Sequence, residues 1–343
     1  MKKPERSLVE KDKHARGKYG GFCFGGQHPD GVSVHNALRS GVEFPNGARA
    51  ALLLTFDVEG TYGNGIGDMK KEIANYKLIC EKLTNENIPA TFNIVAQMAE
   101  EQGPDFIKWM EQADCEIAAH GYVHELNKVF GGDKVYAGHY GLKENLYQVG
   151  KGVEVLNKIC RNPVQGIRLP YAHFNEFTYD AIAETGLKWT SNVGNDDFLF
   201  PGQGFGGHPF QIMLGDKLYP LVEIPLDSQT YDWAVWIADE KANSAFVKAL
   251  RNYCNGQNLP YKRTPEGAIA VWKRRMEQAI EKQSVFTLLC HPINLTVKSS
   301  KWGDPLIEFL FPVIELLAEY RNEKSAWVCT SGQMADFCRR RWK

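Results

Sequence analysis

The sequence predicts an α/β protein whose parallel strands form a closed or nearly closed barrel. The first observation is a repeated alternation of apolar, strand-like segments with amphipathic, helix-like segments from residue 49 onward. The second is the number of such strand–helix units, about seven or eight, which favours a barrel. The third is that titratable residues follow several of the strand-like segments. An open doubly wound sheet is the alternative, but no G-x-G-x-x-G follows the first strand to support a dinucleotide site.

The expected elements follow one another in a regular order. The apolar residues of 69–83 recur at steps of four and three, which places them on one helix face. Gly186 is expected to end the helix that begins at Asn175, and Ser331 to cap the last helix. Strand-like segments lie at 49–56, 90–96, 115–119, 164–169, 221–226, 284–290 and 326–330. Helix-like segments lie at 69–83, 104–112, 142–156, 175–185, 243–253, 265–282, 304–320 and 331–343.

Composition narrows the class of protein. The 343 residues are 43% hydrophobic and 24% charged, as in an ordinary globular protein, and the formal net charge of −1 argues against nucleic-acid and membrane partners. No apolar segment is long enough to cross a bilayer, and the first residues lack the apolar core of a secretory signal, so we expect a cytoplasmic protein. Residues 1–48 are expected to form an irregular extension that packs on the barrel of residues 49–343. A homo-oligomer is left open.

Eight cysteines are scattered through the chain without a C-x-x-C pair. This spacing gives neither a disulfide framework nor a thiolate metal cluster. Most of them lie in apolar surroundings, so we expect reduced, buried thiols.

Polar side chains cluster where the predicted strands end. Because the carboxyl ends of parallel strands in a barrel share one rim, where active sites lie, we expect these side chains to gather there. They are Asp57 and Glu59 after the first strand, His120 and His124 after the third, Arg168 at the end of the fourth, Asp227 and Asp232 after the fifth, and His291 after the sixth.

These residue types suit one kind of chemistry. Two imidazoles and a carboxylate, with further positions left to water, make a catalytic divalent metal site. Such a site acidifies water and polarises a carbonyl group, while a further carboxylate and a histidine serve as base and acid. The reaction indicated is hydrolysis of an amide-type carbon–nitrogen bond. No G-x-S-x-G is present to favour a serine nucleophile.

The order of five short motifs resembles that of the polysaccharide deacetylase superfamily. They are the Asp57–Glu59 pair, HGYVH, RLPY, DSQTYDW and LLCHP, and the resemblance covers roughly residues 45–340. It implies a distorted (β/α) barrel that removes N-acetyl groups. The stretch FPNGARAALLLTFDVEG is similar to the intracellular branch of cytoplasmic peptidoglycan-deacetylase-like, allantoinase-like and cyclic-imide hydrolases.

The resemblance also implies a role for each site residue. His120 and His124 would bind the metal, Zn²⁺ or another divalent ion, and Asp57 would be the general base. Arg168 would hold Asp57, His291 would be the general acid, and Asp232 would tune His291. The superfamily usually has two adjacent aspartates, whereas this chain has Asp57-Val58-Glu59, so the third ligand would be Glu59.

Other interpretations remain open at this point. One is a metal-free, allantoinase-like hydrolase of a cyclic amide, and another is a non-catalytic, carbohydrate-binding barrel. His173 has no assigned role, and Tyr231, Trp233 and Trp236 could line a pocket or belong to the core. The segments 17–48, 192–209 and 230–236 could narrow the mouth of the barrel, which favours a small amide or imide over an N-acetylated sugar polymer.

Overall fold

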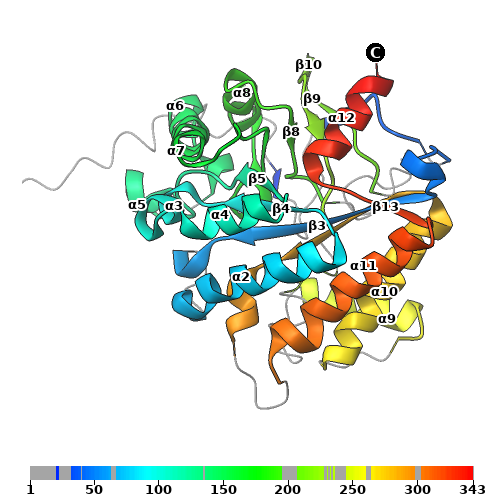
Figure 1. Cartoon of the computed structure of the whole chain (residues 1–343). Coiled ribbons are helices and arrows are strands. Elements are labelled where there is room, and N and C mark those ends of the chain that lie inside the picture. The colour runs from blue at the N-terminus through cyan, green and yellow to red at the C-terminus, as the bar shows by residue number, and fades with distance from the viewer. Residues whose placement is uncertain are drawn as a thin grey trace, which may run out of the picture.

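The structure is a computed structural model of the chain (Figure 1). It describes residues 21–22, 32–39, 41–62, 67–133, 136–194, 207–227, 230, 232, 235, 245–259, 264–297 and 303–342. Most of the segment 17–31, the centre of the loop 192–209, and Tyr231, Trp233 and Trp236 lie outside the described residues.

A sheet of eight parallel strands forms the centre of the protein. The strand β3 is the longest, and all of its residues are buried. One edge of β3 pairs with β12, and the other pairs first with β13 and then with β4. The order in space is β11 (Val222–Glu223), β8 (Trp189–Thr190), β6 (Gly166–Ile167), β5 (Glu116–Ala119), β4 (Ala90–Ile94), β3 (Ala50–Val58) and β12 (Val285–Cys290), with β13 (Ala326–Val328) also on β3.

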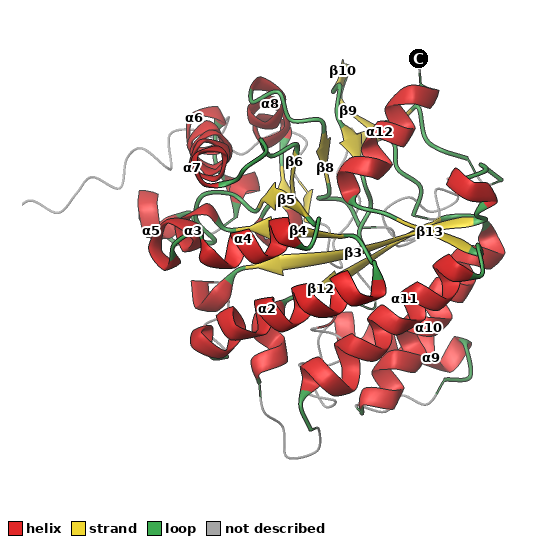
Figure 2. Ribbon diagram, in the orientation of Figure 1, coloured by secondary structure: helices red, strands yellow, loops and turns green. Residues whose placement is uncertain are grey.

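The sheet is curled (Figure 2), and its two ends are joined by a main-chain hydrogen bond. Just after β11, Leu226 forms a bridge with Gly194, and the amide of Asp227 donates to the carbonyl of Thr287 on β12 at 3.3 Å. The sheet is therefore an almost closed barrel, and the predicted distorted (β/α) barrel is confirmed.

Helices cover the outside of the barrel (Figure 1). The helix α2 packs against α4 and α11, and α10 packs against β3, β12 and α11. The longer elements are α2 (Met69–Glu86), α3 (Ala96–Gln102), α4 (Asp105–Gln112), α5 (Asn127–Phe130), α6 (Leu142–Leu146), η4 (Tyr147–Lys151), α7 (Gly152–Ile159), α8 (Glu176–Glu184), α9 (Ala245–Gly256), α10 (Pro265–Lys282), η8 (Leu306–Leu310), α11 (Phe311–Asn322) and α12 (Ser331–Arg341).

The ends of the helices follow local signals in the sequence. Gly186 adopts a φ of +73° two residues after α8, as expected of a glycine that ends a helix. The cap of α12 was expected at Ser331 but is Thr330, whose hydroxyl accepts from the amide of Gln333. The side chain of Gln333 accepts in turn from the amide of Thr330, and this reciprocal capping box fixes the boundary one residue earlier.

Two small antiparallel pairings were not expected from the sequence. One joins β2 (Val32–His35), β9 (Gln211–Leu214) and β10 (Lys217–Leu218), and the other joins β1 (Gly21–Phe22) to β7 (His173–Phe174). Part of the extension predicted to be irregular therefore forms strands. These strands are two to four residues long, too short for an apolar period to reveal them.

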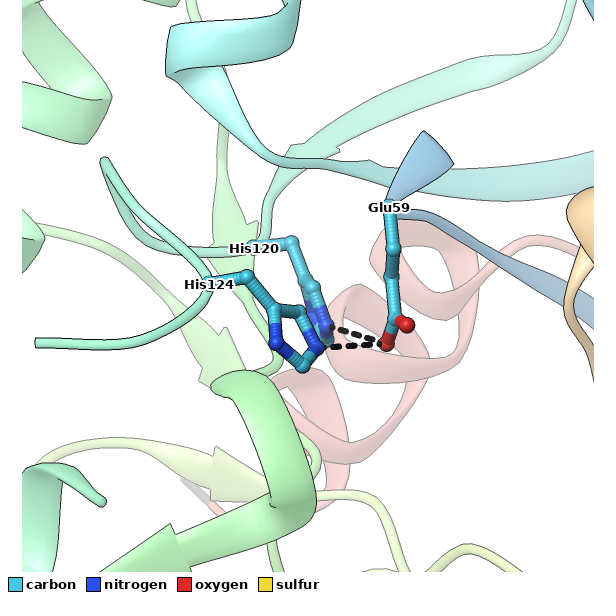
Figure 3. A group of neighbouring side chains, drawn as sticks. All are labelled: Glu59, His120 and His124. Atoms are coloured by element: carbon cyan, nitrogen blue, oxygen red, sulfur yellow. Dashed lines mark hydrogen bonds and ion pairs between the residues drawn. The ribbon is translucent and has the colours of Figure 1, made fainter. Parts of the chain in front are cut away.

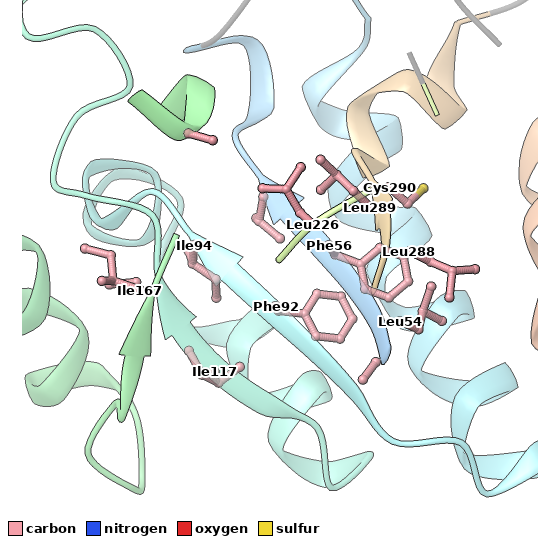
Figure 4. Packing of buried hydrophobic residues seen from close by; sticks show 14 of the residues in the cluster. Leu54, Phe56, Phe92, Ile94, Ile117, Ile167, Leu226, Leu288, Leu289 and Cys290 are labelled. Carbon is pink, nitrogen blue, oxygen red and sulfur yellow. The ribbon is translucent and has the colours of Figure 1, made fainter. Parts of the chain in front are cut away.

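The alternation of side chains along β3 separates two parts of the core. Leu54 and Phe56 point towards the main cluster, where the ring of Phe56 stacks on that of Phe92 with centroids 4.6 Å apart (Figure 4). Ala51 and Leu53 belong to the second cluster, with Trp189 and Val222 from β8 and β11. The row of Ala51 and Leu53 continues to Thr55 and Asp57 at the carboxyl end, because every second residue of a strand faces the same side.

The remaining expectations about composition can be compared with the described residues. All seven described cysteines are free, and six of them are buried. Within the described ranges, no helix has the length and apolar character needed to cross a membrane.

Candidate metal and catalytic site

The polar residues predicted at the strand ends lie together at one rim of the barrel. Asp57 is the penultimate residue of β3, and Glu59 follows that strand directly. His120 follows β5, and Arg168 follows β6, while His291 follows β12. Parallel pairing of these strands places their carboxyl ends side by side.

Glu59, His120 and His124 form the centre of the site (Figure 3). The Oε1 atom of Glu59 lies 3.2 Å from Nε2 of His120 and 3.0 Å from Nε2 of His124. All three side chains are buried, and one ligand atom from each lies within 4.8 Å of the other two. Burial raises the pKa of Glu59, but the neighbouring His124, His291 and His120 outweigh it and hold that pKa well below its usual range.

The donor set fits a divalent metal. Although Nε2 of His124 is 3.0 Å from the carboxylate, neither nitrogen of this 3% exposed ring has a hydrogen-bond partner within the described part of the chain. Buried polar atoms are normally paired, so these nitrogens need an explanation. Two imidazole nitrogens and one carboxylate oxygen at this spacing are a set that zinc prefers.

Asp57 is held beside this centre by two donors. Nη1 of Arg168 lies 2.8 Å from Oδ1 of Asp57, and Nδ2 of Asn93 lies 2.9 Å from the same oxygen. Burial raises the pKa of Asp57, but the charges of Arg168, His120 and His291 outweigh it and lower that pKa overall. Within the described residues both hydrogen bonds end on Oδ1, which leaves Oδ2 available to accept a proton.

Each nitrogen of the Arg168 guanidinium has a partner inside the barrel. Nη1 also donates to the hydroxyl of Thr55 at 3.0 Å, and Nε and Nη2 donate to Ser191. Arg168 is 1% exposed, so these partners replace the water that the charge would otherwise need.

His291 has its own carboxylate partner. Its Nδ1 lies 2.7 Å from Oδ1 of Asp232, and its main-chain amide donates to Oδ2 of the same residue at 2.8 Å. Burial lowers the pKa of His291, but Asp232, Glu59 and Asp57 raise it to about 10. The ring is therefore protonated throughout the neutral pH range, because its pKa lies above the range in which an unperturbed histidine titrates. Its Nε2 points to the centre, 3.6 Å from Oε1 of Glu59.

Two residues near these motifs lie elsewhere. Asp227 follows β11 as predicted, but its carboxylate accepts from Nε of Arg275 on α10 at 2.9 Å and from the hydroxyl of Thr230. His173 is buried, and its ring stacks on that of Tyr136 with centroids 5.0 Å apart. Burial lowers the pKa of His173 to about 4, so the ring is neutral at pH 7.

Sequence reasoning missed the residues that support the base. Asn93 is a polar residue near the carboxyl end of the buried strand β4, and this was a usable signal. Ser191 gave no signal, because the two-residue strand that precedes it was not recognised.

The buried carboxylate of Glu223 supports Arg168 indirectly, through the segment that follows β8. Glu223 on β11 accepts from the amides of Asn192 and Val193, at 2.6 and 2.8 Å, and from the hydroxyl of Tyr179 at 2.7 Å. These contacts fix the segment that follows β8, and Ser191 in that segment holds Arg168. Burial raises the pKa of Glu223 to about 7, although its hydrogen bonds partly oppose that shift.

Comparison with known proteins finds one family that part of the chain resembles. Residues 46–190 match the family model of polysaccharide deacetylase, and this stretch contains the Asp57–Glu59 pair, both histidines of HGYVH and Arg168. Residues 46–190 are therefore similar to polysaccharide deacetylases. The resemblance seen in the sequence is thereby confirmed. The class that the sequence predicted, a hydrolase of carbon–nitrogen bonds other than peptide bonds, agrees with that family. Asp232 and His291 lie beyond the matched stretch.

Several solved structures share the fold of this chain. A protein from Mycobacterium smegmatis assigned as a polysaccharide deacetylase is 22% identical, with a TM-score of 0.63 over 88% of this chain and 94% of its own. One from Pseudomonas aeruginosa PAO1 with the same assignment is 14% identical, with a TM-score of 0.56 over 86% and 92%. The Puue allantoinase is 15% identical, with a TM-score of 0.55 over 86% and 91%. No protein with a curated description matches the chain.

Glu223 should make the stability of this protein depend on pH. Its pKa is near 4.5 in the unfolded chain and about 7 in the folded one, so between these values folding takes up a proton. The free energy of unfolding should fall by about 1.4 kcal/mol per pH unit across this window, and stay level below and above it, from this group alone. Urea unfolding of the wild type and Glu223→Gln from pH 4.5 to 8 measures the difference. A difference that does not change with pH contradicts this role.

Proposed function

We propose that this protein is a metal-dependent hydrolase of an amide-type carbon–nitrogen bond. Glu59, His120 and His124 would hold one divalent metal, for which this donor set favours Zn²⁺. The observation that carries the proposal is the convergence of their three ligand atoms within 4.8 Å, with Asp57 and His291 in contact range of the same carboxylate. When bound, such a metal acidifies a water molecule and polarises a carbonyl oxygen.

Asp57 is the group that takes the proton from water. Arg168 and Asn93 occupy its Oδ1 and keep the carboxylate ionised, so Oδ2 accepts the proton as the water oxygen bonds to the carbonyl carbon. Because both partners hold the same oxygen, the carboxylate cannot turn away from the centre without losing them.

His291 is the group that protonates the leaving nitrogen. Its imidazolium is held by Asp232 through Nδ1, which leaves the proton on Nε2 directed to the centre of the site. As the carbon–nitrogen bond breaks, this proton passes to the nitrogen, which leaves as a neutral amine. Asp232 then faces a neutral ring, which regains a proton before the next turnover.

We further propose a small intracellular amide or cyclic imide as substrate, in preference to an N-acetylated sugar polymer. The three ligand side chains are at most 8% exposed as residues, so the reacting group must enter a confined space. A small substrate gains by such burial, whereas a polymer needs an open groove. Such a compound would be met in the cytoplasm, where the sequence leads us to expect the protein.

Metal binding should depend on this trio of side chains. We expect one equivalent of zinc per chain in protein purified without chelator, and its loss in His124→Ala, because two ligands cannot hold it tightly. Elemental analysis after gel filtration measures both, and His173→Asn serves as the control with another buried histidine replaced. A wild type that contains no metal and takes up none favours the metal-free, allantoinase-like alternative.

Loss of the base should affect turnover and spare the metal. Asp57→Asn keeps the shape of the side chain, so zinc content should stay near that of the wild type. The rate should fall by about 10²–10⁴-fold, as for removal of a general base. Steady-state kinetics on the best substrate found measures the loss, and near-normal turnover would remove Asp57 from the mechanism.

The role of His291 can be read from the leaving group. His291→Gln should slow the hydrolysis of alkylamides, whose amines leave poorly, by a larger factor than that of activated anilides. The measurement compares kcat/KM for a series of amides of one acid. Equal losses across the series would show that His291 binds the substrate or supports the fold instead.

The substrate class can be tested with one panel. Cyclic imides, ureides and simple amides are compared with N-acetylated sugars and chitin oligomers, with and without added zinc. We expect the small amides or imides to give the highest kcat/KM. Faster release of acetate from oligosaccharides would overturn the proposed substrate and keep the reaction class, whereas no hydrolysis of any compound would favour a binding protein.

A further inference from the structure

The short loop between the two histidines is held through almost all of its main-chain polar groups. The carbonyls of Gly121 and Tyr122 accept from the first amides of α3, those of Ala96 and Gln97, at 3.0 and 2.8 Å. The amide of Tyr122 donates to the main-chain carbonyl of Gln148 at 2.9 Å. A loop held in this way carries His120 and His124 at fixed places.

The side chain of Gln148 provides the remaining hydrogen bonds. Its Oε1 accepts from the amides of Tyr122 and Val123, at 3.3 and 3.1 Å, and its Nε2 donates to the carbonyl of Val123 at 2.6 Å. The residue is 1% exposed. It lies in η4, a single π-helical turn between α6 and α7, and such turns are frequent at functional sites because they reposition a side chain.

Two glycines allow this close approach. Gly121 has a φ of +74°, and a Cβ atom there would lie 2.3 Å from Nε2 of Gln148. A Cβ atom on Gly152, at the start of α7, would lie 2.8 Å from the carbonyl carbon of Gly121. The loop and the helix are therefore in direct contact, and the side-chain amide of Gln148 is packed between them.

The outer nitrogens of the two histidines lack the support that metal ligands usually have. A histidine ligand normally donates its second N–H to a carboxylate or carbonyl, which fixes the orientation of the ring. Within the described residues, Nδ1 of His120 and Nδ1 of His124 have no hydrogen-bond partner. The edge contact of His124 with the ring of Tyr171, at 4.7 Å between centroids, restrains one ring only. The geometry of the pair must therefore come from the main chain that carries them.

We propose that Gln148 is a positioning residue for the metal site: its amide fixes the His120–His124 loop and replaces the missing support at the imidazoles. This inference rests on the metal binding proposed above. It predicts that the side chain of Gln148, which does not touch the metal, determines the affinity of the site. Loss of such outer support lowers metal affinity by about 10–100-fold in general.

The experiment compares two buried amides that lie three residues apart. Gln148→Met keeps the length of the side chain and removes its hydrogen bonds to the loop. Asn145→Leu is the matched control, because Asn145 is equally buried but donates to the carbonyls of Ala137, Tyr140 and Gly141, none of which is in the loop. Zinc affinity is measured by competition with a chromophoric chelator, and the thermal midpoint of each metal-free protein is measured in parallel.

A second variant keeps the shape of the side chain. The carboxylate of Gln148→Glu can still accept from the two amides, but it cannot donate to the carbonyl of Val123. Its zinc affinity should lie between those of the wild type and Gln148→Met. The absorption spectrum of the cobalt-substituted proteins reports the ligand geometry, and it should change in the two Gln148 variants but not in Asn145→Leu.

The outcomes separate the two proposals. We expect zinc affinity to fall about 10–100-fold in Gln148→Met and to stay within about threefold of the wild type in Asn145→Leu, even where both lower the thermal midpoint. Equal affinities in the wild type and both Gln148 variants, or an equal loss in Asn145→Leu, would overturn the positioning role alone. A wild type that binds neither zinc nor cobalt would overturn the metal site, and the inference with it.

Discussion

The buried charge of Arg168 is the constraint on which the rim of the barrel depends. An arginine that is 1% exposed needs partners for its charge, because an unpaired buried guanidinium costs several kcal/mol. Its partners come from different strands: Thr55 and Asp57 belong to β3, and Ser191 follows β8. Arg168 itself follows β6, so one side chain joins three strands across the interior. The same contacts hold the carboxylate of Asp57 ionised and in place.

The spacing of the two acids follows from the geometry of a strand. Side chains two residues apart on a strand face the same side, so the Asp57-Val58-Glu59 order directs both carboxylates to the interior. Val58 then faces the main cluster of the core with Phe56. The extra methylene of Glu59 gives its carboxylate the reach to lie within 3.2 Å of both imidazoles from a position beyond the last residue of β3.

The sequence predicted the elements whose signal is local. Long apolar strands and amphipathic helices show their period within ten or so residues, and the rim residues were found because they follow such strands. The strands β6 and β8 have two residues each, and their positions are set by pairing with neighbouring strands. An apolar period cannot be recognised in two residues. The prediction included β6, but only as part of the longer strand-like segment 164–169.

Contacts between residues far apart in the chain could not be derived from the order of residues, and two of them were expected only through the family resemblance. Asp227 and Asp232 both follow β11. The resemblance implied that Asp232 acts on His291, whereas the pairing of Asp227 with Arg275 is seen only in the packing of α10. Gln148 comes 25 residues after Val123, and nothing in the order of residues connects the two. The proposed catalytic groups were therefore easier to recognise than the residues that hold them.

The place where the barrel closes is also the place where the proposed proton donor is held. Among the described residues, one main-chain hydrogen bond joins the end of β11 to β12, from Asp227 to Thr287. The carboxylate of Asp232 crosses the same seam and accepts from His291 and Asn294. A seam with so few hydrogen bonds can open locally, as hydrogen exchange detects in other proteins. Such opening would separate His291 from Asp232. It would remove the first of the carboxylates that raise the pKa of His291, while Glu59 and Asp57 stay at the end of β3, so closure of the barrel and protonation of this acid are linked.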